Sequence, residues 1–179
     1  FSLATAAAAG QVAAAIAKGK KPPFDPLWKN YKDLFSKAQY GRCGFCDMQV
    51  IGVADGDVEH FRPKAAVHDL HANPKNWGYE LPFLSAVRSR QLVEVSKTGY
   101  WWLAYAWVNF LLSCAVCNQK WKRTLFPIVE VRSSPPRKGR RETELLLNPF
   151  GPVDPVKHLD FDRLGQISAR SGSQRGRAT

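Results

Sequence analysis

Two C-x-x-C pairs constrain the fold of this chain more than any other feature of its sequence. They are "CGFC", with Cys43 and Cys46, and "CAVC", with Cys114 and Cys117, and 67 residues separate them. Two such knuckles in one chain are typical of a single tetrahedral zinc ion bound by four thiolates. The alternatives are two disulfides in a secreted protein, or one redox-active pair. No βαβ pattern surrounds either pair, and a disulfide within C-x-x-C is strained. We therefore predict structural zinc and a reducing, cytoplasmic compartment.

The charge balance of the 179-residue chain indicates an anionic partner. The chain has 26 Lys and Arg residues against 15 Asp and Glu, which gives a formal net charge of +11 and a pI near 9.8. A chain with this balance is attracted to polyanions, most often to nucleic acid. An anionic membrane surface is the competing partner, and a basic protein that binds neither is the plain alternative.

The most apolar stretch is residues 99–117, "GYWWLAYAWVNFLLSCAVC". Its length approaches that of a membrane span, but polar residues and two cysteines interrupt it, and Trp and Tyr are dense in its first half. One helical face would carry Trp101, Ala104, Tyr105 and Val108, so the pattern favours a buried helix. We predict no membrane segment here.

The remaining patterns predict short helices and hairpins. Residues 27–39 have the apolar spacing of an amphipathic helix, and residues 47–64 read as a β-hairpin around an Asp-Gly turn. Residues 65–98 show no clean periodicity and are expected to form an irregular insertion with one short helix near 80–90. A closing hairpin is expected at about 159–167.

These patterns divide the chain into three parts. Residues 1–26 are an Ala-rich helix and a Pro-rich connector, for which a signal peptide is the weaker interpretation. Residues 27–165 form the main domain, with the insertion at about 65–98. Residues 166–179 are expected to be a basic, flexible tail. The chain begins at Phe1 and not at Met, which suggests a fragment.

The stretch "DVEHFRPK", residues 57–64, places a carboxylate directly before a histidine. Alone, Glu59-His60 is a weak signal, because acidic residues precede histidines by chance in many proteins. Here the two knuckles lie on either side of it. Asn109 follows in "WVNF", and Asn118 comes directly after the last cysteine in "CAVCNQK".

These motifs, in this order, resemble those of the His-Asn-His (HNH) endonucleases, in their zinc-knuckle form. The resemblance covers about residues 28–165. Within that family, the sequence is similar to a branch whose members are nuclease effectors of bacterial anti-phage systems, such as the Septu-type systems and some retrons. It implies an α+β fold with a ββα-metal core pinned by the four-cysteine zinc site, with helical extensions and an insertion between hairpin and helix. It also implies a metal-dependent endonuclease that hydrolyses phosphodiester bonds of DNA.

The resemblance assigns a role to each residue of the motif. His60 would be the general base, because an imidazole with a near-neutral pKa suits that role. Glu59 lies on the opposite side of its strand and would bind Mg²⁺ or Mn²⁺, with Asn118 as the second ligand. Asn109 would hold the loop that orients His60. The zinc would be structural, because a site with four cysteine ligands is coordinatively closed.

Each of these residues also has a plainer interpretation. His60 is a structural histidine if it stands alone, and Glu59 is an ordinary surface carboxylate. HNH enzymes at large more often carry Asp at the position of Glu59. Asn118 could cap a helix, and Asn109 could be a buried, hydrogen-bonded Asn.

Phosphate contacts are predicted for a set of basic residues near these motifs, with simple solvation as the alternative for Arg62 and Lys64. They are Arg62, Lys64, Lys120, Lys122 and Arg123.

Two further functions compete with the nuclease. One is a zinc-stabilised nucleic-acid-binding module that does not cut, which leaves Glu59-His60 unexplained. The other is a subunit that is active only with a partner ATPase, as the resemblance to defence effectors suggests. DNA is the expected substrate, and RNA remains open.

Overall fold

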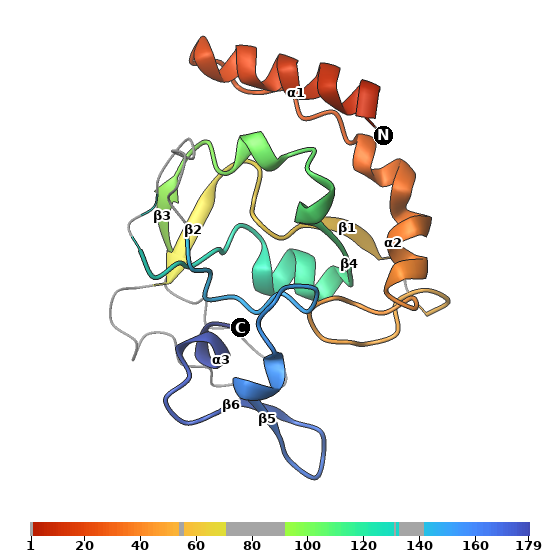
Figure 1. Cartoon of the computed structure of the whole chain (residues 1–179), viewed down its shortest axis with the longest axis vertical. Helices are drawn as coiled ribbons and strands as arrows, with labels where there is room; N and C mark the ends of the chain where they lie inside the picture. The colour runs from red at the N-terminus through yellow and green to blue at the C-terminus, as the bar shows by residue number, and fades with distance from the viewer. Residues whose placement is uncertain (1, 54–55, 71–91, 131, 133–141) are drawn as a thin grey trace. The chain divides into compact units, whose positions relative to one another are not determined.

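The chain folds into short helices and strands of the α+β class, as the sequence predicts. The computed structural model describes residues 2–53, 56–70, 92–130, 132 and 142–179 (Figure 1). The chain divides into two compact units. The first unit comprises residues 1–66 and 97–124, and the second comprises residues 67–96 and 125–179.

The first unit holds all the residues of the HNH-like motif. Its elements are α1 (Ser2–Ala17), the 3₁₀-helix η1 (Leu27–Tyr31), α2 (Lys32–Ala38), β1 (Asp57–His60), the 3₁₀-helices η3 (Trp101–Leu103) and η4 (Trp107–Asn109), β4 (Phe110–Ser113) and the π-helix η5 (Val116–Lys122).

An antiparallel pair of strands forms the centre of the first unit. β1 pairs with β4 so that Asp57 lies opposite Ser113 and His60 opposite Phe110. All four residues of β4 are buried, as expected for a strand that is covered on both faces. Figure 1 shows α2 beside the two strands, and its Phe35 packs in the same core as Phe110. This core also takes in three of the four cysteines, so the knuckles are part of the hydrophobic interior.

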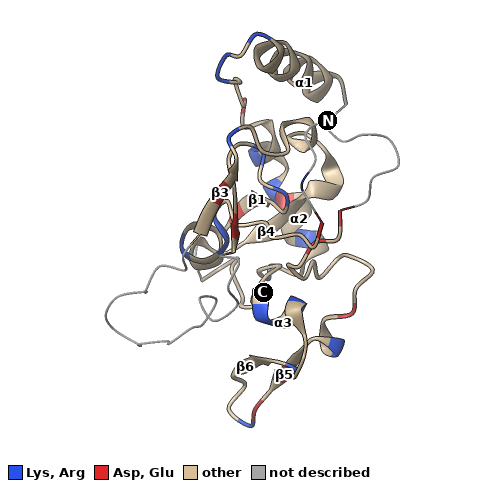
Figure 2. Cartoon of the chain, turned by 90° about the vertical axis from the view of Figure 1, so that its left-hand side faces the viewer, with Lys and Arg blue, Asp and Glu red and all other residues tan. Residues whose placement is uncertain are grey.

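Helix α1 is held by small apolar side chains. Alanine has the highest helix propensity, so its many alanines favour this helix without charged residues along its length. Figure 2 shows α1 free of charge, with basic residues just beyond its end. Its Ala8 and Val12 are buried in the core of the first unit.

Among the described residues, the structure contains no helix of the length and apolar character that crossing a membrane requires.

The described residues of the second unit form two antiparallel pairs of strands and a short C-terminal helix. β2 (Val67–Leu70) pairs antiparallel with β3 (Leu92–Ser96), and β5 (Leu159–Phe161) pairs antiparallel with β6 (Ile167–Ala169). The 3₁₀-helix η6 (Pro155–Lys157) precedes β5, and α3 (Gln174–Ala178) follows β6. The β5–β6 pair confirms the predicted closing hairpin. Residues 166–179, predicted as a tail, contain β6 and α3.

The predicted hairpin over residues 47–64 is wrong. β1 is present, but its partner is β4 and not the "MQVIGV" segment. In that segment Ile51 and Val53 are exposed, and only Val50 is fully buried. The amide of Val50 donates to the carbonyl of Gly41, so the segment closes the first knuckle and does not extend as a strand.

The predicted buried helix in the stretch 99–117 is also wrong. Two 3₁₀ turns, η3 and η4, occupy this stretch, and Val108 is 85% exposed. The chain then becomes extended as β4, whose four buried residues supply β1 with a partner. The predicted helix at 27–39 is present as η1 followed by α2. The predicted insertion at 65–98 contributes β2 and β3, and the short helix expected near 80–90 lies outside the described residues.

Candidate metal sites and a polar cluster

The four cysteines converge on one point in the first unit. Their Sγ atoms all lie within 4.8 Å of one another, although the two pairs are far apart in sequence. A tetrahedral zinc with Zn–S bonds of ~2.3 Å needs sulfurs about 3.8 Å apart, and the Sγ atoms of Cys46 and Cys114 are separated by 3.9 Å. The four cysteines could therefore hold a metal such as zinc.

In each knuckle a backbone amide donates a hydrogen bond to one of the sulfurs. The amide of Phe45 donates to Sγ of Cys43, and the amide of Cys117 donates to Sγ of Cys114, each over 3.4 Å. A hydrogen bond from Cys117 lowers the pKa of Cys43 to about 4, and the same bond raises the pKa of Cys117. Cys43 is thus ready to ionise, and the remaining thiols would lose their protons on binding a metal.

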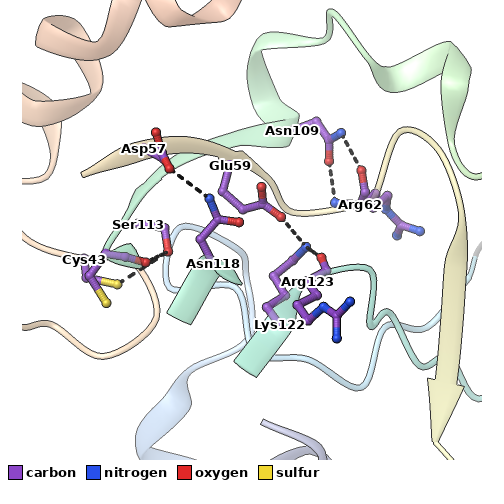
Figure 3. A network of polar contacts seen from close by, with 10 residues as sticks. Cys43, Asp57, Glu59, Arg62, Asn109, Ser113, Asn118, Lys122 and Arg123 are labelled. Atoms are coloured by element: carbon purple, nitrogen blue, oxygen red, sulfur yellow. Dashed lines mark hydrogen bonds and ion pairs between the residues drawn. The ribbon is translucent and has the colours of Figure 1, made fainter. Parts of the chain in front are cut away.

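Strand β1 divides its side chains between two environments. Successive residues of a strand point to opposite faces, and β1 alternates between partly and fully buried positions. Val58 and His60 face the apolar core. Asp57 and Glu59 face the helix η5, which begins between the two cysteines of the second knuckle. Figure 3 shows both carboxylates directed at residues of η5.

Two polar contacts join β1 to η5. Nζ of Lys122 donates to Oε1 of Glu59 over 2.9 Å, and Nδ2 of Asn118 donates to Oδ2 of Asp57 over 3.4 Å. Asn118 and Lys122 are four residues apart on one helical turn, which matches the two-residue spacing of the carboxylates on β1. The cluster thus places two carboxylates of β1 against an amide and an ammonium group of η5.

His60 lies inside the apolar core, with 2% of its surface exposed. Its Nε2 pairs with the carbonyl oxygen of Ala104 over 2.9 Å. Trp28 meets the ring edge-on with centroids 4.6 Å apart, and Phe110 does so at 4.9 Å. Burial, and next the positive charge of Lys64, lower the pKa of His60 to about 3. The ring is therefore neutral at physiological pH.

Asn109 fastens the segment that follows β1. Its Oδ1 accepts from the amide of Arg62 over 2.7 Å, and its Nδ2 donates to the carbonyl of Arg62 over 3.0 Å. The same Nδ2 donates to the carbonyl of Leu103 over 3.2 Å. Asn109 is 4% exposed, so the three bonds fix the chain just after His60.

The basic residues predicted to contact phosphate lie in different environments. Lys120 and Arg123 are exposed at the end of η5. Arg62 lies over the ring of Tyr100 at 5.2 Å, and Nζ of Lys64 lies 4.6 Å from the centre of the Trp28 ring. Lys122 differs from the others because its side chain is only 4% exposed and is paired with Glu59.

The structure adds Asp57 and Trp28 to the site, and it places Lys122, which was predicted to contact phosphate, in a buried ion pair. Asp57 could have been found from strand alternation, because it is two residues before Glu59 and shares its face. The buried role of Lys122 and the contact of Trp28 with His60 depend on distant parts of the chain. No local pattern indicates them.

The motif residues therefore fall into two groups. Glu59 and Asn118 share the polar cluster between β1 and η5. His60 faces the other side of β1, and Asn109 holds the segment behind it.

Comparison with known proteins finds a curated relative that matches most of this chain. The chain is similar to the Septu protein PtuB of Bacillus mycoides (strain KBAB4), with 32% identity over 162 residues. No protein-family model and no solved structure matches the chain. The matched region takes in 89% of this chain but 48% of PtuB, so the chain spans about half the length of the curated relative it matches. Along most of its own length, the chain is therefore similar to part of a Septu protein.

Proposed function

We propose that this protein is a metal-dependent endonuclease of the HNH type, which hydrolyses phosphodiester bonds of DNA in bacterial anti-phage defence. One observation carries the catalytic part of the proposal. Glu59 on β1 and Asn118 on η5 lie in one polar cluster, and η5 begins within the second knuckle (Figure 3). The defence role is supported by the similarity to a Septu protein.

The two proposed metal sites have separate tasks. Four thiolates close the coordination shell of zinc, so that site serves folding. The oxygens of Glu59 and Asn118, with Asp57 beside them, suit a hard divalent cation such as Mg²⁺ or Mn²⁺. That cation would neutralise the negative charge that develops on the phosphate during hydrolysis. We propose a ββα-metal core made of β1, β4 and η5.

His60 is proposed as the base that accepts a proton from water. The bond between Nε2 and the carbonyl of Ala104 fixes the tautomer, because a carbonyl can only accept. Nδ1 then carries the lone pair that takes the proton. For this role the buried ring has to meet water, so the proposal requires the Nδ1 side to open when substrate binds. Asn109 would keep the ring oriented through the backbone of Arg62.

Nucleic acid would be held by charge and not by base recognition. Lys120 and Arg123 are exposed beside the polar cluster and can reach a phosphate backbone. Lys64 is seated on Trp28, and its positive charge contributes to the lowered pKa of His60. These contacts would give affinity for DNA without sequence choice.

A second function is favoured by the burial of His60. A histidine that is 2% exposed with a pKa of about 3 suits a structural role, as in a zinc-stabilised module that binds nucleic acid without cutting it. A third form of the proposal is a subunit that cuts only with a partner ATPase. Cleavage assays separate the three.

The test compares plasmid cleavage by the purified protein with Mg²⁺ or Mn²⁺, with and without partner proteins encoded beside it. Glu59→Gln and His60→Asn keep the size of each side chain, and Glu94→Gln on β3 is the matched carboxylate control. Zinc content and thermal unfolding show that each variant is folded. We expect cutting by the wild type and by Glu94→Gln, and loss of cutting in the other two.

Three outcomes would contradict parts of the proposal. Cutting by His60→Asn at the wild-type rate removes His60 from the mechanism. Cutting by Glu59→Gln at that rate removes the proposed cation site. DNA binding without cutting, with zinc and all partners present, favours the binding module.

A further inference from the structure

The ion pair between Lys122 and Glu59 lies in the interior of the first unit. The side chain of Lys122 is 4% exposed and that of Glu59 is 15% exposed, and 2.9 Å separates Nζ from Oε1. Lysine is almost never fully buried unless it is paired. The ammonium also donates to the carbonyl oxygen of Arg123 over 3.2 Å, so two oxygens hold it in place.

The backbone of η5 is distorted where it holds this ammonium. The amide of Arg123 bonds to the carbonyl of Asn118, five residues earlier, which is the π-helical pattern. Arg123 itself has φ 46° and ψ −119°, a backbone conformation that residues other than glycine rarely adopt. π-turns and strained residues recur at functional sites. Here they direct the Arg123 carbonyl towards Lys122.

We infer that Lys122 is an internal counter-ion that competes with the divalent cation for Glu59. The inference rests on the proposed cation site at Glu59 and Asn118. In the described conformation Lys122 neutralises Glu59, so the site is electrically satisfied without a divalent ion. A cation bound to the other carboxylate oxygen would lie close to the ammonium and repel it.

Cation binding therefore displaces the Lys122 side chain from Glu59. The ion pair raises the cation concentration that binding requires, because a divalent ion can bind Glu59 only by breaking an existing buried interaction. Substrate phosphates that also bind the ion would lower this required concentration. The cluster would thus take up its cation most readily together with substrate.

The first test measures Mn²⁺ binding to the zinc-loaded protein by titration calorimetry. Lys122→Met removes the competing charge and keeps the length of the side chain, and it should bind Mn²⁺ about ten-fold more tightly than the wild type, or tighter. Lys122→Arg keeps the charge and should bind as the wild type does. Lys120→Met, an exposed neighbour on η5, is the matched control and should leave the affinity unchanged.

The second test uses the wild-type chain and does not depend on the folding of a variant. Lysines are acetylated briefly with and without saturating Mn²⁺, and the modified residues are found by mass spectrometry. Lys122 should be protected without Mn²⁺ and modified with it, while Lys120 is modified in both samples.

Equal or weaker Mn²⁺ binding by Lys122→Met overturns the inference, and so does labelling of Lys122 that Mn²⁺ leaves unchanged. If Mn²⁺ binds equally to the wild type and Lys122→Met, and Glu59→Gln abolishes that binding, the cation site stands and only the competition fails. If neither protein binds Mn²⁺ and neither cuts DNA, the proposed function fails as well.

Discussion

Gln39 pairs with Leu112 as a neighbouring β-strand would. Its Oε1 accepts from the amide of Leu112 over 2.6 Å, and its Nε2 donates to the carbonyl of the same residue over 3.0 Å. The carbonyl of Leu112 also accepts from the amide of Gly44 in the first knuckle over 2.8 Å. One buried side chain at the end of α2 thus provides hydrogen-bond partners for both backbone groups of Leu112, two residues before Cys114.

Replacement of Gln39 by Ala should destabilise the first unit. The change leaves a buried amide and part of a buried carbonyl without their partners, which costs about 1–3 kcal/mol. Urea unfolding of the zinc-loaded protein measures the loss. Lys37→Ala, two residues earlier and exposed, should stay within about 0.5 kcal/mol of the wild type. Equal stability of the two variants would show that Gln39 does not support β4.

Acid should destabilise the protein through His60. Its pKa is about 3 in the folded chain and about 6.5 when unfolded, so the unfolded chain takes up the proton first as the pH falls. Stability is fully present above about pH 6.5 and falls by about 1.4 kcal/mol for each pH unit below it, towards pH 3.

The comparison protein for this prediction is His60→Phe, which fills the space between Trp28 and Phe110 but cannot titrate. Urea unfolding at pH 7 and pH 5 should show about 2 kcal/mol more loss in the wild type than in His60→Phe. Both proteins carry the same four cysteines, so loss of any metal held there affects both alike and the difference isolates His60. Parallel loss of stability in the two proteins would refute the depressed pKa.

Gly99 should not tolerate a side chain. It has φ +57°, and a Cβ at this position would overlap the carbonyl group of Ala65. Gly99→Ala is expected to cost about 3 kcal/mol or more, because backbone and not a flexible side chain blocks the space. Gly10→Ala in α1 is the control. Nothing lies within 4 Å of its added Cβ, and the helix should gain about 0.5–1 kcal/mol. Thermal unfolding compares the two, and a mild effect at Gly99 would contradict this backbone geometry.

Arg123 should show a conflict between stability and DNA binding. Glycine accepts φ 46° and ψ −119° without strain, so Arg123→Gly should stabilise the protein by about 1 kcal/mol. The same variant should bind DNA more weakly, and the slope of its log affinity against log salt concentration should be smaller by about one. Arg123→Ala loses the charge but keeps the strain, and should show the weaker binding without the gain. A gain in Arg123→Ala as well would mean that strain is not the cause.

The sequence predicts the parts of this site that depend on local spacing. The C-x-x-C pairs identify the thiol cluster directly, because a knuckle is a local turn with fixed ligand positions. Strand alternation separates Glu59 from His60 on β1 in the same way. Neither inference needs to know which segment lies opposite.

The rest depends on contacts between distant residues. The partner of β1 is β4, about 50 residues later, and the nearer "MQVIGV" segment has equal β-propensity. Residues 101–108 fit a helical spacing, but two 3₁₀ turns before a buried strand can place their aromatic side chains equally well. Lys122 resembles any exposed lysine until Glu59 is known to lie beside it.

The wide separation of the two knuckles also has a consequence for synthesis on the ribosome. β1 and the first pair of thiols emerge long before β4 and the second pair, so the nascent chain holds half of the cysteine cluster and an unpaired strand while the intervening residues are made. Closing a loop of this length is slow relative to local helix formation. During that interval Cys43 and Cys46 are vulnerable to oxidation or to a mismatched metal, and a chain stalled before Cys114 would have no route to the native core.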